Sequence, residues 1–177
     1  MDLRAAHWLL ALCVIATATM AIVLVYPPEW SDPYIQRYVA GIEYHKALGL
    51  VAFIAALALA LQHHRRPPHT GSALEQRAAR IAHLALIVLA LATPAVGFAA
   101  NAFWGEGIAL PGLPPLVSPV SRNERIGAVL TYAHDAGAYA FLALIALHVL
   151  AALRRQLLRR DPVITDMLGV KSKDARR

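Results

Sequence analysis

Histidine is the residue type in this sequence whose number and positions could carry chemistry. The chain has 8 histidines, and a neutral imidazole is both a common metal ligand and a proton carrier near neutral pH. Five lie in or beside long apolar stretches, where ionisable groups are costly and usually functional: His7, His45, His83, His134 and His148. The other three lie in a basic turn and are expected to be solvated: His63, His64 and His69.

The strongest signal is the pair His134 and His148, which are fourteen positions apart. In an α-helix this separation gives a rotation of about 1400°, within ~40° of four full turns, and a rise of about 21 Å. The two side chains are therefore expected on one helix face at two depths. His45 is expected at the depth of His134, and His7 at the depth of His148. The spacing predicts two stacked sites, each with two imidazoles.

The composition limits which cofactor two imidazoles could hold. Cys-x-x-Cys-His is absent, which excludes covalently attached c-type haem. Zinc sites usually need four ligands, often including Cys or carboxylate, and Cys13 is the single cysteine. A b-type haem needs two axial imidazoles and a slot between helices. We expect two haem b groups, and because both axial positions are filled, electron transfer is favoured over oxygen binding.

The remaining candidates lie close to the expected haems. Arg4 and Lys46 are near helix ends and could pair with haem propionates, at the inner and the outer site respectively. His83 has two interpretations: it could replace His7 as the inner ligand, or act as a proton or hydrogen-bond partner for a substrate near the inner haem. A lone histidine at a membrane interface is usually just an amphipathic side chain, but four that match in depth and face favour a ligand set.

The elements that must position these histidines are membrane-spanning helices. The chain is 58% hydrophobic and 16% charged, with a mean hydropathy of +0.50, more apolar surface than a soluble core of this size could hide. A helix needs roughly 20 residues to cross a ~30 Å hydrocarbon layer. Four charge-free stretches approach or exceed this length: Ala5–Pro28, Ala47–His64, Ile81–Gly105 and Ala136–Leu153. Apolar residues run all round them, so amphipathic surface helices are not expected.

We therefore predict an all-α integral membrane four-helix bundle, a single domain over residues 1–177. The helices are expected at about residues 7–26, 43–64, 80–101 and 131–158. The Gly- and Pro-rich segment 103–130 is expected to cap the outer face. The N-terminal run has an alternative interpretation as a cleavable signal peptide, with Arg4 before it and Ala16-Thr17-Ala18 within it. Its continuation to Tyr26 and the even number of helices favour a first membrane span.

The basic residues orient the bundle. Four crossings put both termini on one side, which holds all but four of the 17 Lys and Arg residues; the exceptions are Arg37, Lys46, Arg122 and Arg125. By the positive-inside rule, both termini are expected to be cytoplasmic. The net charge of +6 is explained by this distribution, and no nucleic acid partner is expected.

The sequence resembles the bacterial cytochrome b561 family, which is related to the cytochrome b subunits of nickel-iron hydrogenases and formate dehydrogenases. The matching stretches cover nearly the whole chain: Arg4–Trp8, His45–Gly49, His83 with Pro94–Gly97, Pro114-Pro115 through His134-Asp135 to His148–Leu153, Arg160-Asp161 and Met167-Leu168. The resemblance implies a bacterial inner (plasma) membrane protein. It also implies haem b ligation with the same pairs, His45 with His134 and His7 with His148.

Short stand-alone members of the family are similar to a superoxide oxidase, which passes electrons from superoxide at the outer face to ubiquinone. The resemblance implies that the outer haem receives the electron and that Lys46, Arg122 and Arg125 attract the superoxide anion. The inner haem would reduce quinone near His83, which would relay a proton. Many relatives carry a His-His pair where this chain has Arg155-Gln156, a departure that bears on quinone chemistry and leaves haem binding untouched.

Two other functions stay open at this point. The chain could be a non-catalytic anchor and electron relay in a multi-subunit dehydrogenase or hydrogenase, with another one-electron donor and a redox partner protein. It could also be a structural or sensor bundle without haem.

Overall fold

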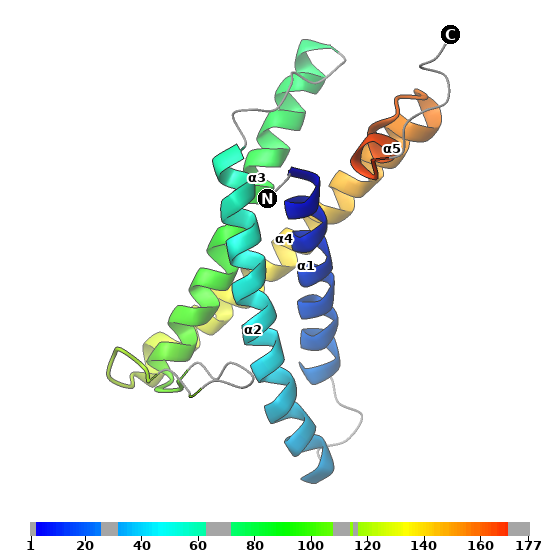
Figure 1. Cartoon of the computed structure of the whole chain (residues 1–177). Coiled ribbons are helices and arrows are strands. Elements are labelled where there is room, and N and C mark those ends of the chain that lie inside the picture. Colours follow the sequence, from blue (N-terminus) through cyan, green and yellow to red (C-terminus); the bar gives the residue numbers. More distant parts are fainter. Residues whose placement is uncertain (1–2, 26–31, 63–71, 108–113, 115–116, 170–177) are drawn as a thin grey trace.

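The computed structural model describes residues 3–25, 32–62, 72–107, 114 and 117–169. The described chain contains five helices: α1 (Leu3–Val25), α2 (Asp32–Gln62), α3 (Ala73–Phe103), α4 (Glu124–Leu158) and the short α5 (Val163–Met167) (Figure 1). The first four are long and apolar enough to cross a membrane. This arrangement confirms the predicted all-α membrane bundle. The turn with His63, His64 and His69 lies outside the described residues.

Two helices, α3 and α4, begin earlier than the apolar runs indicated, because polar caps and not apolar limits set their first residues. α3 begins at Ala73 instead of near residue 80: the hydroxyl of Ser72 accepts from the Glu75 N–H at 3.3 Å, and the Glu75 carboxylate accepts from the Ser72 N–H at 3.1 Å. This capping box satisfies two amides that the helix leaves open. α4 begins at Glu124 instead of near residue 131, where Asn123 Oδ1 accepts from the Ile126 N–H at 3.2 Å.

Further differences concern the start of α2, the outer segment and the residues after α4. α2 begins at Asp32 instead of near residue 43, and its 31 residues make it about two-fifths longer than the predicted span. The outer segment 103–130, expected to be a loop over the bundle, is helical from Glu124 onward. α5 follows α4 after a short connection and was not predicted. Pro94 lies inside α3 without ending it, as membrane helices tolerate.

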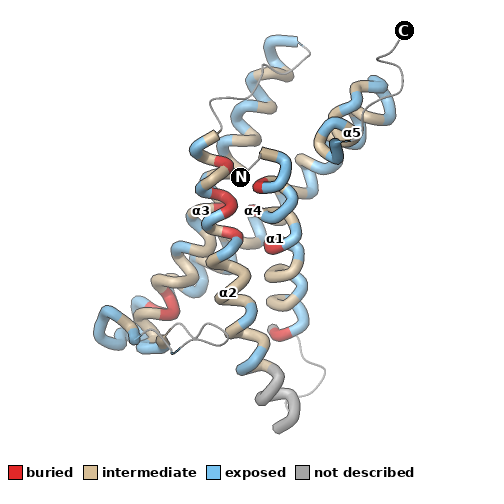
Figure 2. Tube along the Cα trace, in the orientation of Figure 1, coloured by how far each residue is buried: buried red, intermediate tan, exposed pale blue. Residues whose placement is uncertain are grey.

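The four long helices form two hairpins. α1 packs along α2, α3 packs along α4, and a smaller contact between α2 and α3 joins the hairpins. Few described residues are buried (Figure 2), and half of these are alanines, which let helix backbones approach closely. A small core forms where Ala56, Ala90 and Phe141 meet. Neither α1 nor α2 makes more than an isolated backbone contact with α4 within the described chain. The hairpins therefore meet loosely along α4, the helix that carries two histidines.

Candidate functional site

The outer pair of histidines comes from different hairpins. His45 of α2 and His134 of α4 are half-buried, with ring centres 6.2 Å apart and ring planes at 81°. We call the end of the bundle that holds this pair the outer end. The two residues are 89 positions apart in the chain, so the packing of the hairpins brings them together.

Each ring of the outer pair is held through its Nδ1 atom by a backbone carbonyl of a neighbouring helix. Nδ1 of His45 lies 3.1 Å from the carbonyl oxygen of Thr17 in α1. Nδ1 of His134 lies 2.8 Å from the carbonyl oxygen of Thr93 in α3. A carbonyl oxygen only accepts, so both Nδ1 atoms must donate, and the neutral imidazole then keeps its lone pair on Nε2. Metal-ligating histidines are usually oriented by such a bond.

A second pair lies at the other, inner end of the bundle. His7 of α1 and His148 of α4 have ring centres 6.5 Å apart and planes at 48°. His83 of α3 is also close, with its ring centre 5.4 Å from that of His148 and the planes at 67°. All three are half-buried. The structure thus gathers three imidazoles at the inner end and two at the outer end.

The distances between ring centres test whether a haem iron fits between each pair. Two imidazoles on opposite sides of one metal are separated by roughly 6.4 Å between ring centres, with ~2.0 Å for each metal–nitrogen bond and about 1.2 Å from nitrogen to ring centre. The spacings of 6.2 Å for His45–His134 and 6.5 Å for His7–His148 fit this value. The 5.4 Å spacing of His83 and His148 is too short. Both fitting pairs join the α1–α2 hairpin to α4.

Further space lies beside the outer pair. Gly49 is one turn along α2 from His45, and an α-helix places residues four apart on the same face. A Cβ built on Gly49 would meet nothing within 4 Å. A flat macrocycle needs such room next to its axial ligand. Within the described residues, no cluster of three or more His, Cys, Asp or Glu side chains is placed to hold a bare metal ion.

Gly97 of α3, the last residue of the Pro94–Gly97 motif, also shapes the outer site. A Cβ built on it would lie 2.7 Å from Nδ1 and 2.9 Å from Cε1 of His134, closer than real Cβ atoms approach. The missing side chain allows the imidazole to reach the Thr93 carbonyl, one turn away on the same helix. Gly97 is therefore part of the outer site by virtue of its size.

Gly97→Ala is expected to displace the His134 imidazole from the Thr93 carbonyl and weaken retention of the outer haem by 10–100-fold, the usual cost of losing the partner of a ligand. Transfer of haem from the purified protein to an excess of apomyoglobin measures this retention. Ala95→Val is the matched control, because Ala95 is exposed on the same helix. Equal haem transfer from Gly97→Ala and the control would show that Gly97 does not shape the site.

The predicted basic residues lie at the expected ends, but two of them are engaged with acids. Lys46 Nζ is 3.0 Å from Glu106 Oε2, and the lysine side chain is only 16% exposed. Arg122 is paired with Glu124 at 2.9 Å, and both side chains are well exposed. Arg125 is exposed in the first turn of α4. The acids offset much of the positive charge predicted for the outer face.

The Lys46–Glu106 pair is supported by the buried Asn101 at the outer end of α3. Its Nδ2 donates to the backbone carbonyl of Glu106 at 3.0 Å and to that of Gly107 at 3.3 Å. This side chain fixes the turn that presents Glu106 to Lys46, the residue next to His45. Arg4, at the inner end, is exposed and lies against Gly169, where a Cβ would be 3.3 Å from its Nη1.

A family model described as prokaryotic cytochrome b561 matches residues 3–170. The matched range contains both histidine pairs and His83. No curated protein matches the chain significantly.

Proposed function

Since the chain belongs to the prokaryotic cytochrome b561 family, whose members are membrane b-type haem electron-transfer proteins, we propose that it is a dihaem oxidoreductase that passes electrons across the bilayer. The observation that carries this proposal is the presence of two histidine pairs, at two depths, each with the ring spacing of a bis-imidazole haem. The donor is superoxide or another one-electron donor at the outer end, and the acceptor is ubiquinone. Both termini face the cytoplasm of a bacterial inner membrane.

The outer haem is held by His45 and His134, and the inner haem by His7 and His148. The carbonyls of Thr17 and Thr93 bind the Nδ1 atoms of the outer rings, which would leave each Nε2 lone pair available for the haem iron. A bound haem supplies reversible one-electron chemistry. Because two histidines would ligate each iron, the protein would leave no coordination site for oxygen.

The outer basic residues act on the donor before it reaches the site. Lys46, Arg122 and Arg125 attract the superoxide anion, but Glu106 and Glu124 reduce their combined field. We therefore expect modest steering, which weakens further as salt rises.

At the inner end, the proposed role of His83 is proton delivery. Its half-buried ring lies beside His148 without the spacing of a second ligand. Reducing ubiquinone to ubiquinol takes two electrons and two protons, and two superoxide anions release two molecules of dioxygen. An imidazole has two ring nitrogens that can accept and donate a proton, which suits repeated protonation of the reduced quinone.

The purified protein, mixed with superoxide and ubiquinone, is expected to form ubiquinol faster than superoxide alone does. Quinol is measured by its absorbance after extraction, with protein that lacks haem as the blank. Unchanged quinone, in a preparation that carries both haems, would contradict electron transfer from superoxide to ubiquinone. That result would leave the proposed haem ligation standing, because the haem count of the preparation is measured separately.

The resemblance to hydrogenase and formate dehydrogenase cytochrome b subunits favours a second candidate. In that case the protein relays electrons between a redox partner protein and quinone, and superoxide is not its donor. Co-purification of an iron–sulfur or nickel subunit with the full-length chain would support this candidate.

A further inference from the structure

The chain turns back after α4 and returns to the inner end of the bundle. We call residues 161–169, which include α5, the C-terminal turn. Arg160 adopts a left-handed backbone conformation with φ 54°, which lets the chain reverse immediately after α4. No residue of this segment has a role in the proposed electron transfer.

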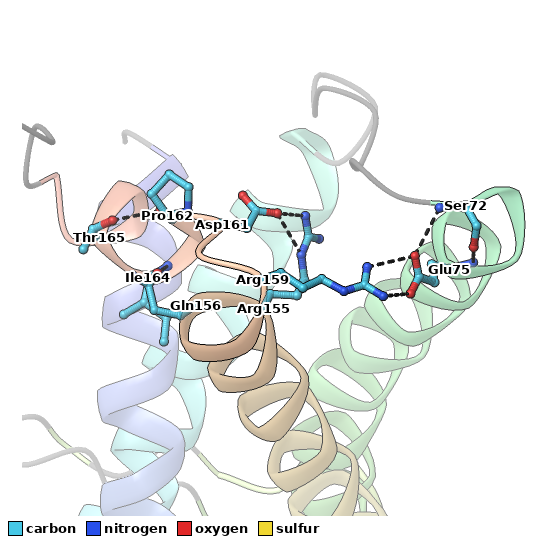
Figure 3. A network of polar contacts seen from close by, with 9 residues as sticks. All are labelled: Ser72, Glu75, Arg155, Gln156, Arg159, Asp161, Pro162, Ile164 and Thr165. Atoms are coloured by element: carbon cyan, nitrogen blue, oxygen red, sulfur yellow. Dashed lines mark hydrogen bonds and ion pairs between the residues drawn. The ribbon is translucent and has the colours of Figure 1, made fainter. Parts of the chain in front are cut away.

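Two adjacent residues at the end of α4 fasten the C-terminal turn (Figure 3). The guanidinium of Arg155 forms an ion pair with Asp161, with its Nε 3.1 Å from Oδ2. The Gln156 side-chain oxygen accepts from the Ile164 N–H in α5 at 3.1 Å. Arg155 and Gln156 are the residues that depart from the His-His pair of relatives. In this chain they contact the C-terminal turn.

The other side of the C-terminal turn contacts α1 next to a proposed haem ligand. Trp8 Nε1 donates to the Met167 carbonyl at 3.0 Å. The Trp8 ring meets the His7 ring edge-on, with centres 5.2 Å apart and planes at 90°. Contacts therefore run from Gln156 through α5 to Trp8, and from Trp8 to His7.

The hydrogen bond between Trp8 and the Met167 carbonyl matters because Trp8 lies at the surface, with 38% of the residue exposed. An exposed indole has other rotamers available, and the Met167 carbonyl selects the one in which the ring edge contacts His7. A ring so placed restricts rotation of the neighbouring imidazole. It also covers one side of the ligand against water.

We propose that the C-terminal turn is a positioning element of the inner haem site, which Gln156 and Arg155 hold in place and which sets the orientation of His7 through Trp8. The proposal rests on the proposed function, in which His7 is an inner haem ligand. When the contact is lost, water reaches the inner site more easily and stabilises the charged oxidised haem. The potential of the inner haem then falls, while that of the outer haem stays the same.

The test uses the full-length, haem-loaded protein with Gln156→Leu and Trp8→Phe as separate variants. Gln156→Leu removes the acceptor for Ile164, and Trp8→Phe keeps an aromatic ring but removes the N–H. We expect both variants to keep two haems, to shift the inner haem to lower potential in a redox titration, and to alter its electron paramagnetic resonance signal.

Glu75→Gln is the matched control. It weakens the Glu75–Arg159 ion pair, which joins the same end of α4 to α3 at 3.0 Å but does not lead to Trp8, and we expect wild-type potentials. If Gln156→Leu does not fold, Trp8→Phe decides alone. An unchanged inner haem in Trp8→Phe would overturn the proposal and leave the haem ligation intact. A wild-type protein without an inner haem would instead overturn the proposed function.

Discussion

His134→Ala is expected to leave a protein with one haem instead of two, which no longer passes electrons from the outer to the inner end. The imidazole of His134 is one of two proposed axial ligands of the outer haem, 6.2 Å between ring centres from His45. Alanine offers no ligand, and no other histidine is described at that end. The inner pair lies about 21 Å further along α4 by helix geometry and is expected to keep its haem.

The pyridine haemochrome assay on the purified variant measures the ratio of haem to protein. The electron paramagnetic resonance spectrum adds the identity of the lost haem. The planes of the outer imidazoles are nearly perpendicular, at 81°, and those of the inner pair are at 48°. Ligand planes that are closer to perpendicular give the more anisotropic haem signal, so the more anisotropic of the two signals is expected to be lost. Tyr132→Ala, an exposed position of the same helix, is the control with two haems. Two haems in His134→Ala would contradict the outer pairing.

His83→Ala is expected to keep both haems and to slow ubiquinol formation by about a hundredfold, within the usual range for losing a general acid. His7→Ala is expected to lose the inner haem. The reason is the spacing: 6.5 Å between the rings of His7 and His148 fits an iron between them, whereas 5.4 Å between His83 and His148 does not. Haem stoichiometry and the rate of quinol formation are measured on both variants.

The rate at which superoxide reduces the outer haem is the internal control for both variants, because neither change touches that end. Loss of a haem from His83→Ala, with two haems retained in His7→Ala, would assign the inner ligand to His83. An unchanged quinol rate in His83→Ala would remove its proposed role as proton donor.

The sequence predicted the spans because apolar length is a property of the sequence alone. It predicted less about helix ends, because polar residues continue the helices beyond the apolar runs. The signal was present for α3, since Ser72 followed three residues later by Glu75 is a capping box. Asn123 before α4 is a weaker sign of the same kind.

The parts of the site that sequence could not predict depend on contacts between distant segments. The carbonyls of Thr17 and Thr93 orient the outer histidines, but any residue has a carbonyl, so no residue type marks them. The pairing of Lys46 with Glu106 joins positions 60 residues apart, and the charges alone indicated an unpaired basic face. Gly97 was visible as a glycine within an apolar helix, although the imidazole that needs its space belongs to α4.

The central claim is that this chain holds two haems, one in each histidine pair. A reduced-minus-oxidised absorbance spectrum of the purified wild-type protein, combined with a pyridine haemochrome count, tests it most directly. We expect the Soret and sharp alpha bands of b-type haem on reduction with dithionite, and two haems per chain. A colourless preparation, or a fully loaded protein with a single haem, would contradict the claim.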